Sequence, residues 1–188
     1  MNDFVHLHCH SEYSLLDGMS TPEDIARISS KNGQTAAAIT DHGTMGGVLK
    51  FQSACKKYGV KPIFGIEAYF VPDVNNDDMD AKAERFHLIL LAKNNEGLSK
   101  LFKATKTAWA DNFYYKPRID FPLLSSLVDD DVVALSGCRG SAIAKAIENG
   151  DESRAAKLSE KFIEIFKDDF YFEIQPWNPK EINDGIID

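Results

Sequence analysis

The stretch Ala36–Val71, AAAITDHGTMGGVLKFQSACKKYGVKPIFGIEAYFV, decides the fold class of this 188-residue chain. Its first residues, Ala36–Ile39, are small and apolar and predict a buried strand. Apolar residues at helical spacing follow and predict an amphipathic helix that ends at Gly59. Lys61–Val71 then predicts a second strand. A strand, a helix and a strand in this order are typical of α/β proteins.

The alternation continues on both sides of this stretch. Upstream, Phe4–His8 alternates apolar and polar residues like a short strand, and Ser20–Asp24 has the cap, proline and acids that begin a helix, which Gly33 is placed to end. Downstream, the expected strands are Phe86–Ala92, Val132–Leu135 and Phe170–Ile174, and the expected helices are Glu96–Ala110, Ser141–Glu148, Glu152–Phe166 and a last one after Pro179. The helix over 96–110 is expected to turn Leu98, Leu101, Phe102 and Trp109 inward.

Strands that alternate with helices predict an α/β fold with a parallel sheet, either doubly wound or closed into a barrel. Periodicity does not choose between these two. An eight-stranded barrel needs about 250 residues, so a chain of this length predicts an incomplete or reduced barrel. Asp73–Glu84 and Asp111–Pro122 show no periodic pattern, and we expect a solvated loop and an irregular segment there.

Composition limits the possible functions. Hydrophobic residues make up 44% of the chain, which excludes a disordered protein. The formal charge of −8 excludes a polybasic nucleic-acid binder, so any such contact must be local. The longest apolar run, Leu88–Ala92, is far shorter than a membrane span, and the N-terminus lacks the basic start of a signal peptide. Three cysteines cannot form a closed set of disulfides. We therefore expect a cytoplasmic protein without a membrane partner.

The stretch His6-Leu7-His8-Cys9-His10, followed by Asp17, carries the strongest chemical signal. Residues two apart in an extended chain project to the same side, so His8 and His10 can converge on one cation. Neutral imidazole is a strong ligand for zinc, manganese and iron. The alternative is a polar strand end with scattered histidines.

Further candidate ligands lie near other strand ends, where sites of α/β proteins gather. Asp41 and His42 follow one strand, Glu67 lies near the end of the next, and Cys138 follows a third. His87 lies instead at the start of its strand. Each residue alone has an ordinary explanation: a turn, an acid paired with arginine, a buried thiol or a core histidine. Together they predict a metal cluster at one mouth of a barrel.

Several other kinds of site lack their sequence signals. No phosphate-binding Gly-x-x-x-x-Gly-Lys-Ser/Thr loop and no strand-linked Gly-x-Gly-x-x-Gly occurs, so nucleotide binding of these types is unsupported. No Cys-x-x-Cys pair occurs, which argues against a zinc ribbon or a thioredoxin-like site.

These residues resemble a known family. The matching segments are Phe4–Ser11, Leu15–Gly18, Ile39–Gly43, Lys61–Tyr69, Phe86–Leu88, Lys116–Asp120 and Leu135–Cys138. In this order they resemble the PHP (polymerase and histidinol phosphatase) domain of bacterial and phage replicative DNA polymerases of the polymerase III alpha type. The Lys-Pro-Arg-Ile-Asp and Ser-Gly-Cys segments are similar to the polymerase branch and not to the small phosphatases.

The resemblance implies a distorted (β/α)7 barrel of TIM-like form over residues 1–188, with up to three divalent metals, usually zinc, manganese or iron. It assigns His8, His10 and Glu67 to the first metal. It assigns Glu67, His87 and Cys138 to the second, and Asp17 and His42 to the third. His6 and Asp41 would lie behind these ligands and orient them. Asp17, Asp41 and His42 are the candidate catalytic residues.

The chain departs from the family pattern in one respect. PHP proteins supply two further ligands, an Asp-x-His on a last strand, and no such pair follows Cys138. The family would place that strand just past Asp188. The chain is thus expected to be a fragment truncated before its last strand, or a naturally short or split protein whose site another chain completes.

The resemblance implies work in DNA replication, as part of a DNA-directed DNA polymerase with other replisome subunits. Metal-competent members act as a 3′→5′ exonuclease on single-stranded 3′ ends, whereas members that have lost ligands are scaffolds. A histidinol-phosphatase-like activity is the third possibility. Basic and aromatic residues between Lys93 and Arg118 suggest a track for DNA, although a solvated helix face would look the same. The candidate DNA contacts are Lys100, Lys103, Lys106, Arg118 and Arg139.

Overall fold

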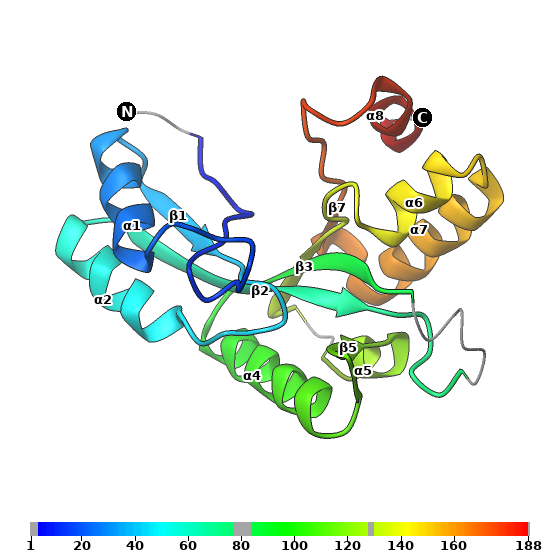
Figure 1. The fold of residues 1–188 in the computed structure, drawn as a ribbon, viewed down its shortest axis with the longest axis horizontal. Coiled ribbons are helices and arrows are strands. Elements are labelled where there is room, and N and C mark those ends of the chain that lie inside the picture. The colour runs from blue at the N-terminus through cyan, green and yellow to red at the C-terminus, as the bar shows by residue number, and fades with distance from the viewer. Residues whose placement is uncertain (1–3, 77–83, 128–129, 188) are drawn as a thin grey trace.

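The computed structural model describes residues 4–76, 84–127 and 130–187. Within these ranges the chain forms one seven-stranded sheet with helices packed around it. Figure 1 shows the long strands of this sheet crossing the middle of the molecule, with helices at both ends and below. The described residues include no helix long and apolar enough to cross a membrane.

The sheet is mixed, with parallel and antiparallel neighbours. Its strands are β1 (Ala36–Ile39), β2 (Lys61–Phe70), β3 (Phe86–Ala92), β4 (Phe113–Tyr114), β5 (Lys116–Ile119), β6 (Val132–Leu135) and β7 (Phe170–Tyr171). They are ordered β4-β5-β2-β3-β6-β7, and β1 pairs with the first half of β2. Strand β3 runs antiparallel to both of its neighbours, β2 and β6.

The expected all-parallel sheet is therefore wrong at β3. Parallel neighbours need a crossover connection, usually through a helix, whereas antiparallel neighbours do not. The described residues between β2 and β3 contain no helix, and β3 returns along β2 with Phe70 opposite Phe86. This reversal places the start of β3 beside the ends of β2 and β6.

The helices largely follow the sequence pattern. They are α1 (Pro22–Lys31), α2 (Val48–Tyr58), α4 (Asn95–Ala110), α5 (Phe121–Leu127), α6 (Ala142–Glu148), α7 (Glu152–Phe166) and α8 (Lys180–Ile187). Thr21 caps α1 in a capping box with Asp24, and Gly59 ends α2 with a φ of 69°. The expected inward face of α4 is partly wrong, because Phe102 and Trp109 are exposed while Leu101, Ala104 and Ala108 are buried.

Two segments differ from their expected structure. The expected irregular segment 111–122 contains β4, β5 and the first residues of α5, and β5 pairs with the end of β2. Phe4–His8 is not a strand, although residues 6–9 lie beside the end of β1. The amides of Ala38 and Thr40 donate to the carbonyls of His6 and Cys9, respectively. Strand β5, Lys-Pro-Arg-Ile, lacks the apolar run that identifies the equally short β1 and β6.

The two faces of the sheet pack differently. Leu88 and Leu90 of β3 point into the main core under the helices, whereas Ile89 and Leu91 belong to a smaller apolar cluster with Leu135. Alternate residues of a strand point to opposite faces, so His87 shares the second face with Ile89. The candidate metal ligands gather on this second face.

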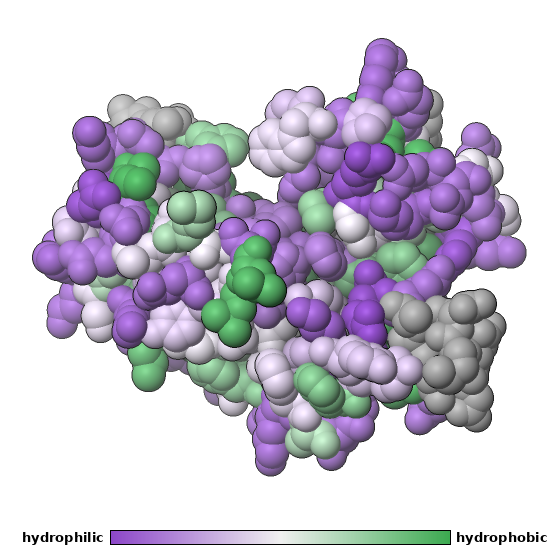
Figure 2. Space-filling model, viewed as in Figure 1, coloured by the Kyte–Doolittle hydropathy of each residue, from purple (hydrophilic) through white to green (hydrophobic). Residues whose placement is uncertain are grey.

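A cleft of about 910 Å³ opens beside that face, between the N-terminal segment and the chain after β7. Phe4, Leu7, Ile63, Leu91 and Trp177 are among the residues that line it. Figure 2 shows it as a notch at the upper edge of the molecule. In the same view a hydrophobic group covers the N-terminal loop that Figure 1 draws in dark blue, where Leu15, Leu16 and Met19 are almost fully exposed.

Candidate metal centre

Strand β2 places Glu67 at the middle of the candidate centre. The segment after β1 continues along β2, so that the Gly43 amide donates to the Glu67 carbonyl and the Glu67 amide donates to the Asp41 carbonyl. On the other side of β2, His87 lies opposite Tyr69, one step diagonally from Glu67 on the same face. The backbone of β2 thus brings His42 and His87 to opposite sides of one carboxylate.

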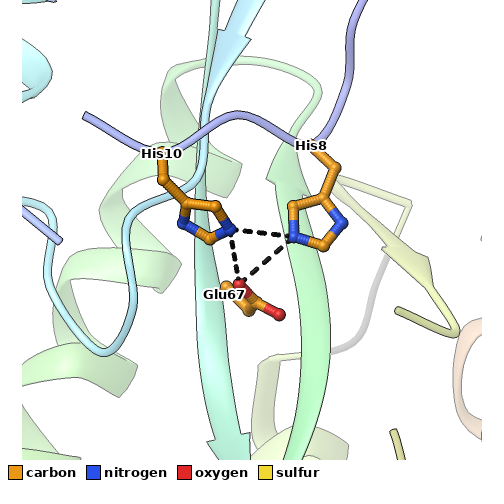
Figure 3. A group of neighbouring side chains, drawn as sticks. All are labelled: His8, His10 and Glu67. Carbon is orange, nitrogen blue, oxygen red and sulfur yellow. Dashed lines mark hydrogen bonds and ion pairs between the residues drawn. The ribbon is translucent and has the colours of Figure 1, made fainter. Parts of the chain in front are cut away.

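The N-terminal segment supplies two more imidazoles. The Cys9 amide donates to the Thr40 hydroxyl (2.9 Å), which holds the segment beside the end of β1. His8 and His10, two residues apart, both project toward Glu67, as Figure 3 shows. Their Nε2 atoms lie 3.1 Å apart.

One oxygen of Glu67 is surrounded by nitrogen atoms. Glu67 Oε2 lies 3.2 Å from His8 Nε2, 2.9 Å from His10 Nε2 and 3.1 Å from His42 Nε2. Glu67 is 1% exposed, yet Oε2 makes no hydrogen bond with the described residues. The three nitrogens are close to this oxygen but do not have hydrogen-bonding geometry toward it. This is the arrangement expected when nitrogen and oxygen atoms are all ligands of one cation.

The other oxygen of Glu67 faces His87 and Cys138. His87 Nδ1 lies 2.9 Å from Glu67 Oε1 and 3.3 Å from Cys138 Sγ. Cys138 Sγ is 3.7 Å from the same Glu67 oxygen. Gly140 permits this approach, because a Cβ there would stand 2.8 Å from His87 Nδ1.

Asp17 approaches the centre from the exposed side. Its Oδ2 lies 3.5 Å from His10 Nδ1 and 3.6 Å from His42 Nε2, and its side chain is 47% exposed. Three groups have ligand atoms close enough to share an ion: His8, His10 and Glu67; His10, Asp17 and His42; and His42, Glu67 and His87. Because the groups share members, the centre is continuous and not three separate sites.

The donor set fits transition-metal ions or zinc. Imidazole nitrogen, carboxylate oxygen and a cysteine sulfur are ligands of Zn²⁺, Fe²⁺ and Mn²⁺, and the sulfur and nitrogen donors disfavour Ca²⁺ and Mg²⁺. The buried Glu67 Oε2 and His42 Nδ1 have no hydrogen-bond partner among the described residues. Atoms of this kind cost free energy when buried, and a bound cation would compensate Glu67 Oε2.

Burial and charge shift the pKa values of these side chains strongly. Burial lowers the pKa of His8, but the hydrogen bond to Glu173 and the nearby negative charges of Glu173 and Glu67 outweigh it and raise the value to about 10. Burial also lowers the pKa of His87, but contacts with Cys138 and Glu67 outweigh it and raise the value to about 9. The His42 ring makes no such bond with the described residues, and burial lowers its pKa to about 4.

The same contacts act on Glu67 in the opposite sense. Burial alone would raise its pKa, but contacts with His10, His8 and His87 bring it far below its ordinary range. Glu67 is therefore ionised at every pH at which the protein is handled, as a bridging ligand requires.

Asp41 positions the N-terminal segment. Its buried carboxylate accepts hydrogen bonds from the Ser11 amide (2.5 Å) and the Ser11 hydroxyl (2.9 Å). Burial raises the pKa of Asp41, and these bonds partly offset the shift. The Asp41 carboxylate thus holds the residue next to His10, while the Asp41 carbonyl accepts from the Glu67 amide (3.2 Å). His6 stands apart, exposed and packed edge-on against Phe4.

Two residues that sequence reasoning missed also contact the ligands. The buried Ser14 hydroxyl accepts from the His42 amide (3.2 Å) and donates to Asp17 Oδ2 (3.3 Å). Glu173, just past β7, accepts a hydrogen bond from His8 Nδ1 (2.9 Å). Glu173 lies inside the expected strand Phe170–Ile174, of which only Phe170–Tyr171 forms β7, so no strand-end signal identified it in the sequence. Ser14 gave no signal either.

Three of the five candidate DNA contacts are engaged with other residues of the chain, and two are exposed. Lys100 pairs with Asp131 (2.8 Å), Arg139 pairs with Glu148, and Arg118 is buried with its Nε donating to the Asn112 carbonyl. Lys103 and Lys106 remain exposed on α4. Trp109 stacks on Phe113 and donates its indole N–H to the Gly43 carbonyl (2.8 Å).

Comparison with known proteins extends this description. The PHP domain family matches residues 6–176. The DNA polymerase III subunit alpha of Aquifex aeolicus is 37% identical over 186 residues, which cover 95% of this chain and 16% of that protein. The same subunit of Borreliella burgdorferi is 39% identical over 191 residues, which cover 98% of this chain and 16% of that protein. This chain therefore spans about one sixth of the length of these relatives.

The fold also has a counterpart among solved structures. A crystal structure from Bifidobacterium adolescentis, of a protein assigned as a metal-dependent phosphoesterase, superimposes with a TM-score of 0.59 at 14% identity. The match covers 100% of this chain and 82% of that one. This likeness supports an α/β fold of the same general kind. The chain belongs to the PHP domain family, and its sequence is similar to the DNA polymerase III alpha subunits of several bacteria.

Proposed function

We propose that this chain is a metal-dependent phosphodiesterase module of a replicative DNA polymerase, which removes nucleotides from single-stranded 3′ ends. The observation that carries the proposal is the placement of three imidazole nitrogens within 3.2 Å of one oxygen of Glu67. Three divalent ions at most, of zinc, manganese or iron, would be held by His8, His10, Asp17, His42, Glu67, His87 and Cys138. Divalent ions in such a site would polarise the phosphodiester and neutralise the charge that develops on it.

The protein's own residues hold this centre in place. Glu67 is ionised and buried, so it would bridge ions without competing protons. His42 keeps a free lone pair at neutral pH because its pKa is about 4. Asp17 is half-exposed and lies where a substrate would enter, and Asp41 fixes the segment that carries His10. Asp17, Asp41 and His42 are therefore our candidates for catalytic and positioning roles.

We extend the proposal to the architecture of the intact domain. Residues 1–188 would form a PHP domain in the shape of a distorted (β/α)7 barrel that is completed by one further strand with an Asp-x-His pair. The mixed sheet and the cleft beside it are compatible with that form. The remaining polymerase chain and other replisome subunits are the proposed partners, and the cytoplasm is the proposed location.

Release of nucleotides from 5′-labelled single-stranded DNA in the presence of Mn²⁺ tests the activity. We expect removal of 3′ nucleotides by the parent chain, or by the chain with its natural C-terminal continuation, and loss of this activity in His8→Ala and Asp17→Asn. Lys157→Gln, an exposed change on α7, serves as the matched control. Equal activity in all variants would contradict the proposal.

Two other outcomes would favour a different function. Protein that binds no metal by elemental analysis, and whose removal destabilises the polymerase, would be a scaffold. Hydrolysis of phosphate monoesters without action on DNA would indicate a phosphatase of the histidinol-phosphate type.

A further inference from the structure

Two aromatic rings stand exposed at the end of α4. Trp109 and Phe113 stack with ring centroids 5.4 Å apart and an interplanar angle of 22°. They are 52% and 49% exposed, although aromatic side chains of this size usually bury most of their surface. We call this pair the aromatic platform. Its free ring faces can accept a further flat group.

The platform is fixed to the candidate metal centre. The Trp109 indole N–H donates to the Gly43 carbonyl over 2.8 Å, and Gly43 directly follows His42. The Gly43 amide in turn donates to the Glu67 carbonyl (2.9 Å). A Cβ at Gly43 would stand 2.9 Å from Pro117 and from Tyr69, so this junction is closely packed. The platform therefore keeps a constant position relative to His42.

Exposed lysines lie near the platform in the chain and beside the candidate metal centre. Lys106 and Lys103 are exposed on α4, three and six residues before Trp109. Lys116 places its ammonium group 5.2 Å from the centre of the Tyr69 ring, and Tyr69 stacks on His42 at 5.5 Å. A chain with a formal charge of −8 thus presents lysines and aromatic rings together beside its candidate metal centre.

We propose that the aromatic platform binds single-stranded nucleic acid, with a base stacked on Trp109 and Phe113 and the backbone phosphates facing Lys103, Lys106 and Lys116. The inference deepens the proposed function, because it supplies the path by which a strand reaches the metal centre. Bases stack on aromatic side chains without sequence preference, and lysines contribute through phosphate charge. A protein partner that packs on the two rings would not need the three lysines. These residues therefore favour nucleic acid as the occupant.

Trp109 fluorescence provides a direct test. The chain has two tryptophans, so replacing Trp177 makes the emission specific to Trp109. In a Trp177→Phe background with EDTA present, we expect a thymidine oligonucleotide to quench Trp109 emission. An abasic oligonucleotide of the same length and charge should quench weakly and bind about tenfold less tightly, because it has no base to stack. Phe113→Leu should weaken binding of the thymidine strand by about the same factor, while Phe172→Leu, a similarly exposed ring elsewhere, should not.

Charge variants test the second half of the proposal. Lys106→Gln should reduce the slope of log affinity against log salt by about 0.7, the value for one lost single-strand phosphate contact. Lys157→Gln on α7 is the control and should leave the slope unchanged.

The assay separates this inference from the proposed function. Binding that persists in EDTA and in His8→Ala would support the platform. If the chain with its C-terminal continuation then released no nucleotides with Mn²⁺, the phosphodiesterase would be contradicted while the platform stood. Equal affinity for the thymidine and abasic strands, or no effect of Phe113→Leu, would overturn the platform whatever the hydrolytic activity. Absence of oligonucleotide binding would overturn it as well and leave a protein as its occupant.

Discussion

Two carboxylates on opposite sides of the His8 ring determine which of its nitrogens can serve a cation. Glu173 Oε1 accepts the hydrogen bond from Nδ1, and Glu67 lies beside Nε2. A histidine ligand bonded in this way has a fixed ring orientation and greater basicity at the other nitrogen. Gln175 supports Glu173 by donating to the same oxygen (2.6 Å), and Ser136 accepts from the Glu173 amide (2.8 Å).

Replacing Glu173 should therefore weaken metal binding without contact between Glu173 and the metal. We expect Glu173→Ala to reduce affinity for Zn²⁺ or Mn²⁺ about tenfold to a hundredfold, as is usual when such a partner is lost. Competition with a chelating dye measures the change. Glu160→Gln, an exposed substitution on α7, should bind like the parent. Parent-like affinity in Glu173→Ala would show that His8 does not need this support.

Metal affinity should also depend on pH. The pKa values of His8 and His87 are raised to about 10 and about 9, so both rings carry a proton at neutral pH that an entering cation must displace. Apparent affinity is therefore expected to rise with pH, by up to about tenfold per pH unit for each displaced proton, and to level off only above about pH 10. Titration calorimetry in buffers of different ionisation enthalpy counts the released protons. Affinity that is constant between about pH 6 and pH 8 would contradict the expectation.

The sequence was informative about candidate ligands that share one segment or lie at strand ends, and uninformative about the side chains that support them. The spacing of His8 and His10 on one extended segment predicted that both could bind the same cation. Glu173 is 165 residues away from its partner His8, and no local pattern relates the two. Ser14 acts through a hydroxyl, which is common in every loop.

At the scale of elements, the antiparallel pair β2–β3 does most to build the centre. Gly65 lets the two strands approach closely: a Cβ there would stand 2.5 Å from the Leu90 carbonyl and 2.7 Å from a Leu91 methyl group. Glycine within a strand often marks such an approach of another backbone. Glu67 lies two residues further along the same strand.

Gly65→Ala should accordingly disturb both stability and the metal centre. We expect a loss of about 1–3 kcal/mol in the free energy of unfolding, the usual range for overpacking, together with weaker metal binding as β2 shifts. Gly59→Ala is the matched control, because Gly59 has φ 69° but nothing within 4 Å of its Cβ position. It should cost about 1 kcal/mol and leave metal affinity unchanged. Denaturant unfolding and dye competition measure the two quantities, and parent-like values for Gly65→Ala would disprove this account.

Elements with an apolar run or a helical period were predictable, whereas β4, β5 and α5 were not. The expected bounds of β3, β6 and α7 agree with the structure, and α2 ends at Gly59 as expected. Strand direction was beyond a periodic pattern, because β3 has the same alternation whichever way it runs. That direction explains His87: it begins its strand yet lies at the same edge as residues that end theirs.

At the scale of the whole molecule, the centre concentrates ionisable groups that a cation would stabilise. The chain carries a formal charge of −8, and the buried carboxylate of Glu67 has an oxygen without a hydrogen bond among the described residues. Ions that bind the folded state and not the unfolded chain shift the folding equilibrium by mass action.

Addition of Zn²⁺ or Mn²⁺ should therefore raise the melting temperature. At a concentration of about 100 times the dissociation constant, one bound ion stabilises by about 2.7 kcal/mol, which corresponds to about 5–10 °C for a chain of this size. Calcium is the control ion, since nitrogen and sulfur donors suit it poorly, and it should have little effect. Glu67→Gln should respond less than the parent. Equal shifts with Ca²⁺ and Mn²⁺ would indicate nonspecific binding to acidic side chains.

The reversed strand has a consequence for the order of assembly. Glu67 and His87 belong to adjacent strands and come together through contacts of short sequence separation, which form early in folding. His8 and Glu173 meet only when the two ends of the chain dock, and closing so long a loop is slow. During refolding, a half-formed centre of Glu67 and His87 would therefore exist before the N-terminal histidines arrive. The time at which a metal ion becomes tightly held would mark the closing of the molecule as a whole.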